Sequence, residues 1–131
     1  SNEDKIINQI VQRFYGHFTI RLSDILYTIK ILNKGVDYDE IICKSLEYGI
    51  LDASKSYLGF IIHNFRNFVD SESIKKFGNL DNCKFIYEGK LVFHIDKKYV
   101  TKFYFLKFYS TGEIQMHHFL LLKIHFFLLV F

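Results

Sequence analysis

The sequence predicts an α+β fold, in which N-terminal helices pack on a C-terminal antiparallel sheet of three or four strands. Two observations predict this fold. Before residue 80, large apolar residues recur at helical spacing, and after residue 82 aromatic and β-branched residues form short runs separated by glycine turns. The length of 131 residues fits a single α+β domain over residues 1–131, and an apolar content of 50% is too high for a disordered chain.

The first two predicted helices are amphipathic. One ends near Gly16, and the next follows Ser23, a candidate N-cap, and stops at Gly35. Their apolar stripes consist of Ile6, Ile7, Ile10, Val11 and Phe14 in the first helix and of Leu22, Ile25, Leu26 and Ile29 in the second.

Three further helical segments are predicted before residue 82. Asp37 and Glu40 have capping-box spacing and start a third helix. Residues 57–69 fit helical spacing or a strand, and helix is favoured because of the length of the segment. Asp70 then starts a short helix that runs to about Leu80.

The C-terminal part predicts strands. A hairpin is expected around Glu88–Gly89, followed by a long strand over residues 99–109 and a hairpin loop at Ser110–Gly112. The last strand, Leu120–Val130, is apolar on both faces, which is typical of a strand covered on both sides. We therefore expect it to be a central strand or the interface of a homodimer, with a membrane-surface contact as the less favoured reading.

A transmembrane segment is not expected at this end of the chain. The apolar run over residues 119–131 contains Lys123 and His125. It is also shorter than the roughly 20 residues of a spanning helix.

The same patterns predict a hydrophobic core drawn from both halves of the chain. Its expected members are Ile7, Ile10, Val11, Phe14, Ile25, Leu26, Ile29, Ile41, Leu46, Ile61, Phe65, Phe103 and Phe105.

Charge and cysteine usage limit the possible partners and sites. The formal net charge of +3 is carried by scattered lysines of the C-terminal half, which favours a solvated sheet face over a phosphate-binding surface. Cys43 and Cys83 lie far apart without a ligand cluster, so we expect two buried thiols, no metal site and no cofactor. With no signal peptide in view, a cytoplasmic protein is expected.

One pair of side chains is a candidate for binding a ligand. His94 and Asp96 lie two residues apart on one predicted strand, so they share a face and could form a His–carboxylate pair in a pocket. The alternative, a structural histidine beside a surface carboxylate, is favoured. His117 and His118 are adjacent and point to opposite faces of a strand, so they cannot hold one ion together. No catalytic motif is present in the sequence.

Two segments resemble one family of α+β domains. The stretch YVTKFYFLKFYSTGEIQMHHFLLL resembles the closing hairpin of NTF2-like (SnoaL-like) domains, and INQIVQRFYGHF is similar to their first helix, with Phe14 and Tyr15 as its aromatic pair. Residues 36–70 depart from that pattern, because they predict helices where the family has its first strands. The resemblance implies a pocket between helices and a curved sheet, and dimerisation through the sheet.

These observations favour a non-enzymatic binding or protein-interaction module that dimerises through its sheet, with a small-ligand pocket as an option. An enzyme is the less favoured reading. The alternative is a winged-helix nucleic-acid-binding domain, because residues 22–51 read as helix, turn, helix before a β-rich stretch. Its second helix, however, shows Asp39, Glu40 and Glu47 against a single Lys44, which does not suit an approach to phosphates.

Overall fold

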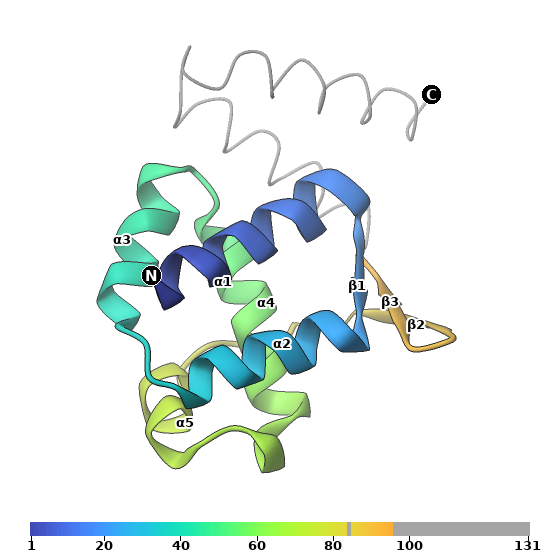
Figure 1. Cartoon of the computed structure of the whole chain (residues 1–131). Coiled ribbons are helices and arrows are strands. Elements are labelled where there is room, and N and C mark those ends of the chain that lie inside the picture. Colours follow the sequence, from blue (N-terminus) through green and yellow to red (C-terminus); the bar gives the residue numbers. More distant parts are fainter. Residues whose placement is uncertain (84, 96–131) are drawn as a thin grey trace.

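The structure is a computed structural model that describes residues 1–83 and 85–95. In this part of the chain, five α-helices and a small antiparallel sheet confirm the α+β class (Figure 1). The predicted strands after residue 96 and the residues Phe103 and Phe105 lie outside the described residues. The helices are α1 (Asn2–Val11), the π-helical turn η1 (Gln12–His17), α2 (Leu22–Asn33), α3 (Tyr38–Glu47), α4 (Leu51–Asn64), the 3-10 turn η2 (Arg66–Phe68) and α5 (Ser71–Phe77). The strands are β1 (Thr19–Arg21), β2 (Ile86–Gly89) and β3 (Val92–His94).

Helix α1 is central to the packing. It contacts α2, α3 and α4, and α4 in turn contacts α5 (Figure 1). The buried face of α1 presents Ile6, Ile7 and Ile10, and Phe14 of η1 extends it. These are the residues of the predicted stripe, with Val11 half-buried at its edge.

Two of the three predicted N-caps are confirmed. The carboxylates of Asp37 and Asp70 accept the N–H groups of residues three positions further on, at 3.2 Å in each case. Ser23 as N-cap is wrong, because α2 begins at Leu22, directly after the short strand β1. In the first turn of α2, Asp24 takes the capping role and accepts the Arg21 N–H at 2.8 Å.

The ambiguous segment is helical up to Asn64. Helix α4 passes close to the chain after α5, and Gly59 is the point of contact, because a Cβ there would overlap the Asp81 carbonyl oxygen. A glycine that weakens a helix by propensity is thus required by packing. Beyond Asn64 the prediction of one continuous helix is wrong, and Phe68 of η2 is exposed.

The sheet has the order β1–β3–β2, with both pairs antiparallel. Two of its strands form the predicted hairpin, and the third, β1, comes from the N-terminal half, where no strand was expected. Phe93 of β3 packs against Phe60 of α4, with ring centroids 5.1 Å apart. The predicted turn at Glu88–Gly89 is wrong by two residues. Because Gly89 pairs with Val92, the loop is Lys90–Leu91.

Two expected core residues lie at the surface. Leu26 is 49% exposed and Leu46 is 55% exposed. On α2 the buried face also includes Asp24, Thr28 and Leu32, which turns Leu26 outward. Ile7, Ile10, Phe14, Ile25, Ile29, Ile41 and Ile61 are buried as predicted, and Phe65 is half-buried.

None of the helices in residues 1–83 and 85–95 has the length and apolar content needed to cross a bilayer.

Candidate interaction groove

The end of β1, the start of α2 and the β2–β3 hairpin flank a shallow, open and largely apolar surface groove of about 370 Å³. We call it the hairpin groove. Leu26 lies on its α2 side, and Leu91 lies on its hairpin side. Its lining residues are Arg21, Leu22, Ser23, Leu26, Lys90, Leu91 and Val92.

Main-chain hydrogen bonds fix the two sides of the groove to each other. The Leu22 N–H donates to the Leu91 carbonyl at 2.9 Å, and the Ile95 N–H donates to the Phe18 carbonyl at 3.1 Å. Between them, β1 pairs with β3. The first of these bonds satisfies an N–H that the start of a helix leaves without an intrahelical partner. The groove is therefore a built feature of the fold.

A largely buried ion pair supports the α2 side. Arg13 Nε lies 3.0 Å from Asp24 Oδ2, the same oxygen that accepts the Arg21 N–H. Arg13 belongs to the π-helical turn η1, which extends α1 toward the start of α2. The Asp24 carboxylate is thus buried and paired with Arg13, and Asp24 is not among the described residues that line the groove.

The hairpin loop holds a large apolar side chain in an uncommon backbone conformation. Lys90 and Leu91 have φ angles of 52° and 62°. Both lie in the left-handed region, which two-residue hairpin loops require and which Asn and Gly adopt most easily. Leu91 is nevertheless 57% exposed. Its main chain is held by the bond to Leu22 and by the Tyr87 hydroxyl, which accepts the Leu91 N–H at 3.4 Å.

The groove is apolar with a positive rim. Among the described side chains that line it, Arg21 and Lys90 are cationic and none is a carboxylate. Both cations are exposed to solvent. The surface therefore combines exposed leucines with positive charge.

The second polar cluster is internal and structural. Tyr57 of α4 is fully buried, and its hydroxyl lies 2.7 Å from Thr28 Oγ1 of α2. Burial raises the pKa of Tyr57 well above its ordinary value, although the bond to Thr28 opposes this shift. The phenol therefore stays neutral and serves as a hydrogen-bonding core residue.

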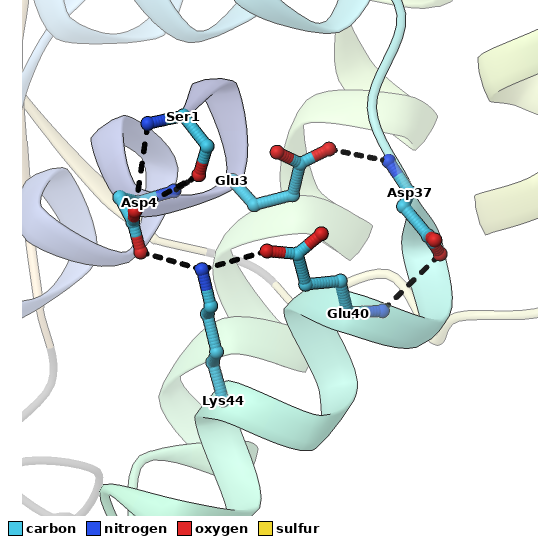
Figure 2. Close-up of polar contacts among 6 residues, drawn as sticks. All are labelled: Ser1, Glu3, Asp4, Asp37, Glu40 and Lys44. Carbon is cyan, nitrogen blue, oxygen red and sulfur yellow. Dashed lines mark hydrogen bonds and ion pairs between the residues drawn. The ribbon is translucent and has the colours of Figure 1, made fainter.

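A charged cluster joins the N-terminal turn of α1 to α3 (Figure 2). The Lys44 ammonium donates to Asp4 Oδ1 at 2.6 Å and pairs with Glu40 Oε1 at 2.7 Å. Glu3 Oε1 accepts the Asp37 N–H at 2.7 Å. The bond from Lys44 is the main cause that lowers the pKa of Asp4 to about 2. The bond from Asp37 is the main cause that lowers the pKa of Glu3.

This cluster bears on the winged-helix alternative. Helices α2 and α3 form as predicted, but a further helix, α4, follows them before the hairpin. Lys44, the one cation expected to meet phosphates from α3, is held by two carboxylates, and Asp39 and Glu47 are exposed beside it. Nucleic-acid binding stays a prediction, and titration of duplex DNA at several salt concentrations tests it.

The predicted ligand pair is described only in part. His94 lies half-buried in β3, paired in register with Thr19 and Ile86, and Asp96 lies outside the described residues. Cys83 is a buried free thiol as expected, whereas Cys43 is exposed, which corrects the expectation of two buried thiols. No group of three or more His, Cys, Asp or Glu side chains within residues 1–83 and 85–95 is placed to hold a metal ion.

Sequence reasoning missed the hairpin groove, because its two sides lie about seventy positions apart in the chain. One local signal was available. Lys90–Leu91 follows Gly89 at the point where a hairpin must turn, without the Asn or Gly that such a loop favours.

Comparison with protein-family models, with curated proteins and with solved structures gave no match.

Proposed function

We propose that this chain is a non-enzymatic binding module and that the hairpin groove is one of its binding faces. The observation that carries this proposal is the exposed apolar pair Leu26 and Leu91 on two elements that main-chain bonds lock together. Adjacent apolar side chains in a groove with cations beside them support a recognition role for this surface.

The backbone of the loop supports the same proposal. A bulky residue in the left-handed region costs about 1–2 kcal/mol relative to glycine. An exposed Leu91 recovers only part of this cost, because more than half of its side chain stays in water. Leu91 is therefore not favoured at this position by folding stability, and this fits a role of its side chain in binding.

We also propose, from the sequence, that the chain forms a homodimer. Strands over residues 99–109 and Leu120–Val130 would extend the sheet, and the surplus apolar face of the last strand would meet a second copy. This arrangement agrees with the resemblance to NTF2-like domains.

A dye titration tests the groove. The probe is 8-anilinonaphthalene-1-sulfonate, whose apolar rings match the leucines and whose sulfonate matches Arg21 and Lys90. We expect saturable fluorescence enhancement, and an affinity about tenfold lower for Leu91→Asp because the change removes an apolar contact and adds a like charge near the sulfonate.

Leu46→Asp is the matched control, since Leu46 is about as exposed as Leu91 and lies on α3. This variant should bind the dye like the wild type. Equal binding by Leu91→Asp and the wild type would show that the groove takes no ligand of this kind.

Light scattering tests the homodimer. The wild type should have the mass of two chains. Asp at Leu121 and Phe127 on one face, or at Leu122 and Ile124 on the other, should separate the two roles: changes on the interface face should give a folded monomer or a poorly soluble chain, and changes on the core face should unfold the protein. A wild type that stays monomeric at high protein concentration would contradict the dimer.

A further inference from the structure

We propose that the hairpin groove docks on an anionic lipid surface, with Leu91 entering the acyl boundary and Lys90 and Arg21 at the level of the phosphates. This inference rests on the proposed function, because it names the partner of that same groove. It follows from the shape of the hairpin, its charge and the size of the apolar surface.

The shape suits a flat partner. The β2–β3 hairpin lies at one edge of the described part of the chain, away from α3 and α5 (Figure 1). Leu91 occupies its loop and is 57% exposed, with Leu26 beside it across the groove. The bond from the Leu22 N–H fixes the loop to α2, so the leucine is presented on a rigid support.

The distribution of charge favours one orientation of the molecule on an anionic surface, with the hairpin toward that surface. Lys90 and Arg21 flank the leucines, and the one carboxylate in the first turn of α2, that of Asp24, is buried and paired with Arg13. The acidic side chains of the cluster in Figure 2 lie on α1 and α3, away from the hairpin. With the hairpin facing an anionic surface, the positive rim meets the headgroups and the acidic cluster points away.

The size of the apolar surface favours lipid over a protein partner. Among the described residues, seven line the groove, which is a small patch beside the roughly 20–30 residues a side of a stable protein interface. One or two inserted apolar side chains with two cations give weak, reversible binding to a membrane surface, well short of stable anchoring. Long basic side chains also reach the phosphates while their stems cover apolar surface.

Co-sedimentation of the whole chain with vesicles tests the proposal. We expect binding to phosphatidylcholine vesicles that contain about 30% phosphatidylglycerol. Binding should be about 25-fold weaker to pure phosphatidylcholine or in high salt, because two cations each contribute roughly fivefold. Lys90→Ala should weaken binding about fivefold, and Lys34→Ala, which removes an exposed lysine at the far end of α2, should not.

The apolar contact is tested by a matched pair of variants. Leu91→Asp should lower the affinity for anionic vesicles at least about tenfold, and Leu46→Asp should bind like the wild type. Because all variants share residues 119–131, any contribution of that apolar segment cancels in the comparison. Asp is tolerated in the left-handed region, so Leu91→Asp should keep the thermal midpoint of the wild type.

A fluorescence readout locates the insertion. The chain contains no tryptophan, so Leu91→Trp provides a single reporter. Its emission should shift to shorter wavelength with anionic vesicles and stay unchanged with pure phosphatidylcholine. An unchanged emission, or equal vesicle binding by Leu91→Asp and Leu46→Asp, would overturn the lipid proposal. If the dye still binds in the groove, the binding module stands with a different partner; if the dye also fails, both proposals fall.

Discussion

Gly59 allows a test in which helix propensity and packing predict opposite signs. Gly59 lies inside α4, where alanine is the better helix former by about 1 kcal/mol. Propensity alone therefore predicts that Gly59→Ala stabilises the protein. The structure predicts the reverse, because the added Cβ would overlap the Asp81 carbonyl oxygen and lie 3.2 Å from the Asp81 carbonyl carbon.

The neighbouring chain is not free to move away. His63 Nε2 donates to the Leu80 carbonyl at 2.6 Å, and Asn64 Nδ2 donates to Asn82 Oδ1 at 3.0 Å. Relieving the overlap needs a shift of about 1 Å against these bonds. Overpacking costs about 1–3 kcal/mol, and each strained hydrogen bond adds up to about 1 kcal/mol. After the propensity gain of about 1 kcal/mol is subtracted, we expect Gly59→Ala to lower the free energy of unfolding by about 2 kcal/mol.

Urea unfolding followed by circular dichroism measures this difference. Gly16→Ala is the matched control, because Gly16 lies in η1 and a Cβ there would have nothing within 4 Å. It should be neutral or stabilising. Gly59→Ala as stable as the wild type, or more stable, would refute the close approach of α4 to the Asp81 carbonyl.

Two further predictions concern charge. The pKa of Asp4 lies at about 2, below its ordinary value of 3.8, so its contribution to stability is present above about pH 4 and is lost as the pH falls toward 2. The difference in thermal midpoint between the wild type and Lys44→Ala should therefore shrink over that range, and a constant difference would contradict the ion pair. Asp24→Ala should lower the free energy of unfolding by about 3–5 kcal/mol, because it leaves the Arg13 cation buried without its carboxylate. In urea unfolding, a loss below about 1 kcal/mol would show that Arg13 finds another partner.

Local signals in the sequence predicted the helix starts well. Asp37 and Asp70 act as caps because an N-cap depends on residues a few positions apart, all of which the sequence displays together. In a capping box the Glu40 carboxylate would accept the Asp37 N–H, but in the structure a residue of a different helix accepts it. That N–H donates to Glu3, and no local pattern contains this pairing.

Tertiary contacts explain the failures. Periodicity placed Leu26 and Leu46 on buried stripes, but the sequence does not show how many neighbours cover a helix or from which side. The buried face of α2 contains Asp24 and Thr28, which are polar and are satisfied by Arg13 and Tyr57. Because polar residues are usually exposed, the predicted buried face of α2 excluded Asp24 and Thr28 and included Leu26 instead.

The sequence misplaced the hairpin turn and did not reveal the groove, and the two failures have related causes. The loop was predicted at position 89 because glycine favours turns. In the structure the loop is Lys90–Leu91, and Gly89 lies in the bulged end of β2. A leucine in the left-handed region is unfavourable locally and is held by the bond between its carbonyl and Leu22. The exposed pair Leu26 and Leu91 is therefore visible only once α2 and the hairpin are seen together.

The central claim, that the hairpin groove binds a ligand, is tested most directly by mapping 8-anilinonaphthalene-1-sulfonate on the isotope-labelled whole chain by NMR. The largest saturable shifts of amide signals should fall on Leu22, Leu26, Leu91 and Val92, on both sides of the groove. Shifts that are absent from these residues, or that gather around the exposed Leu46 of α3, would contradict the claim.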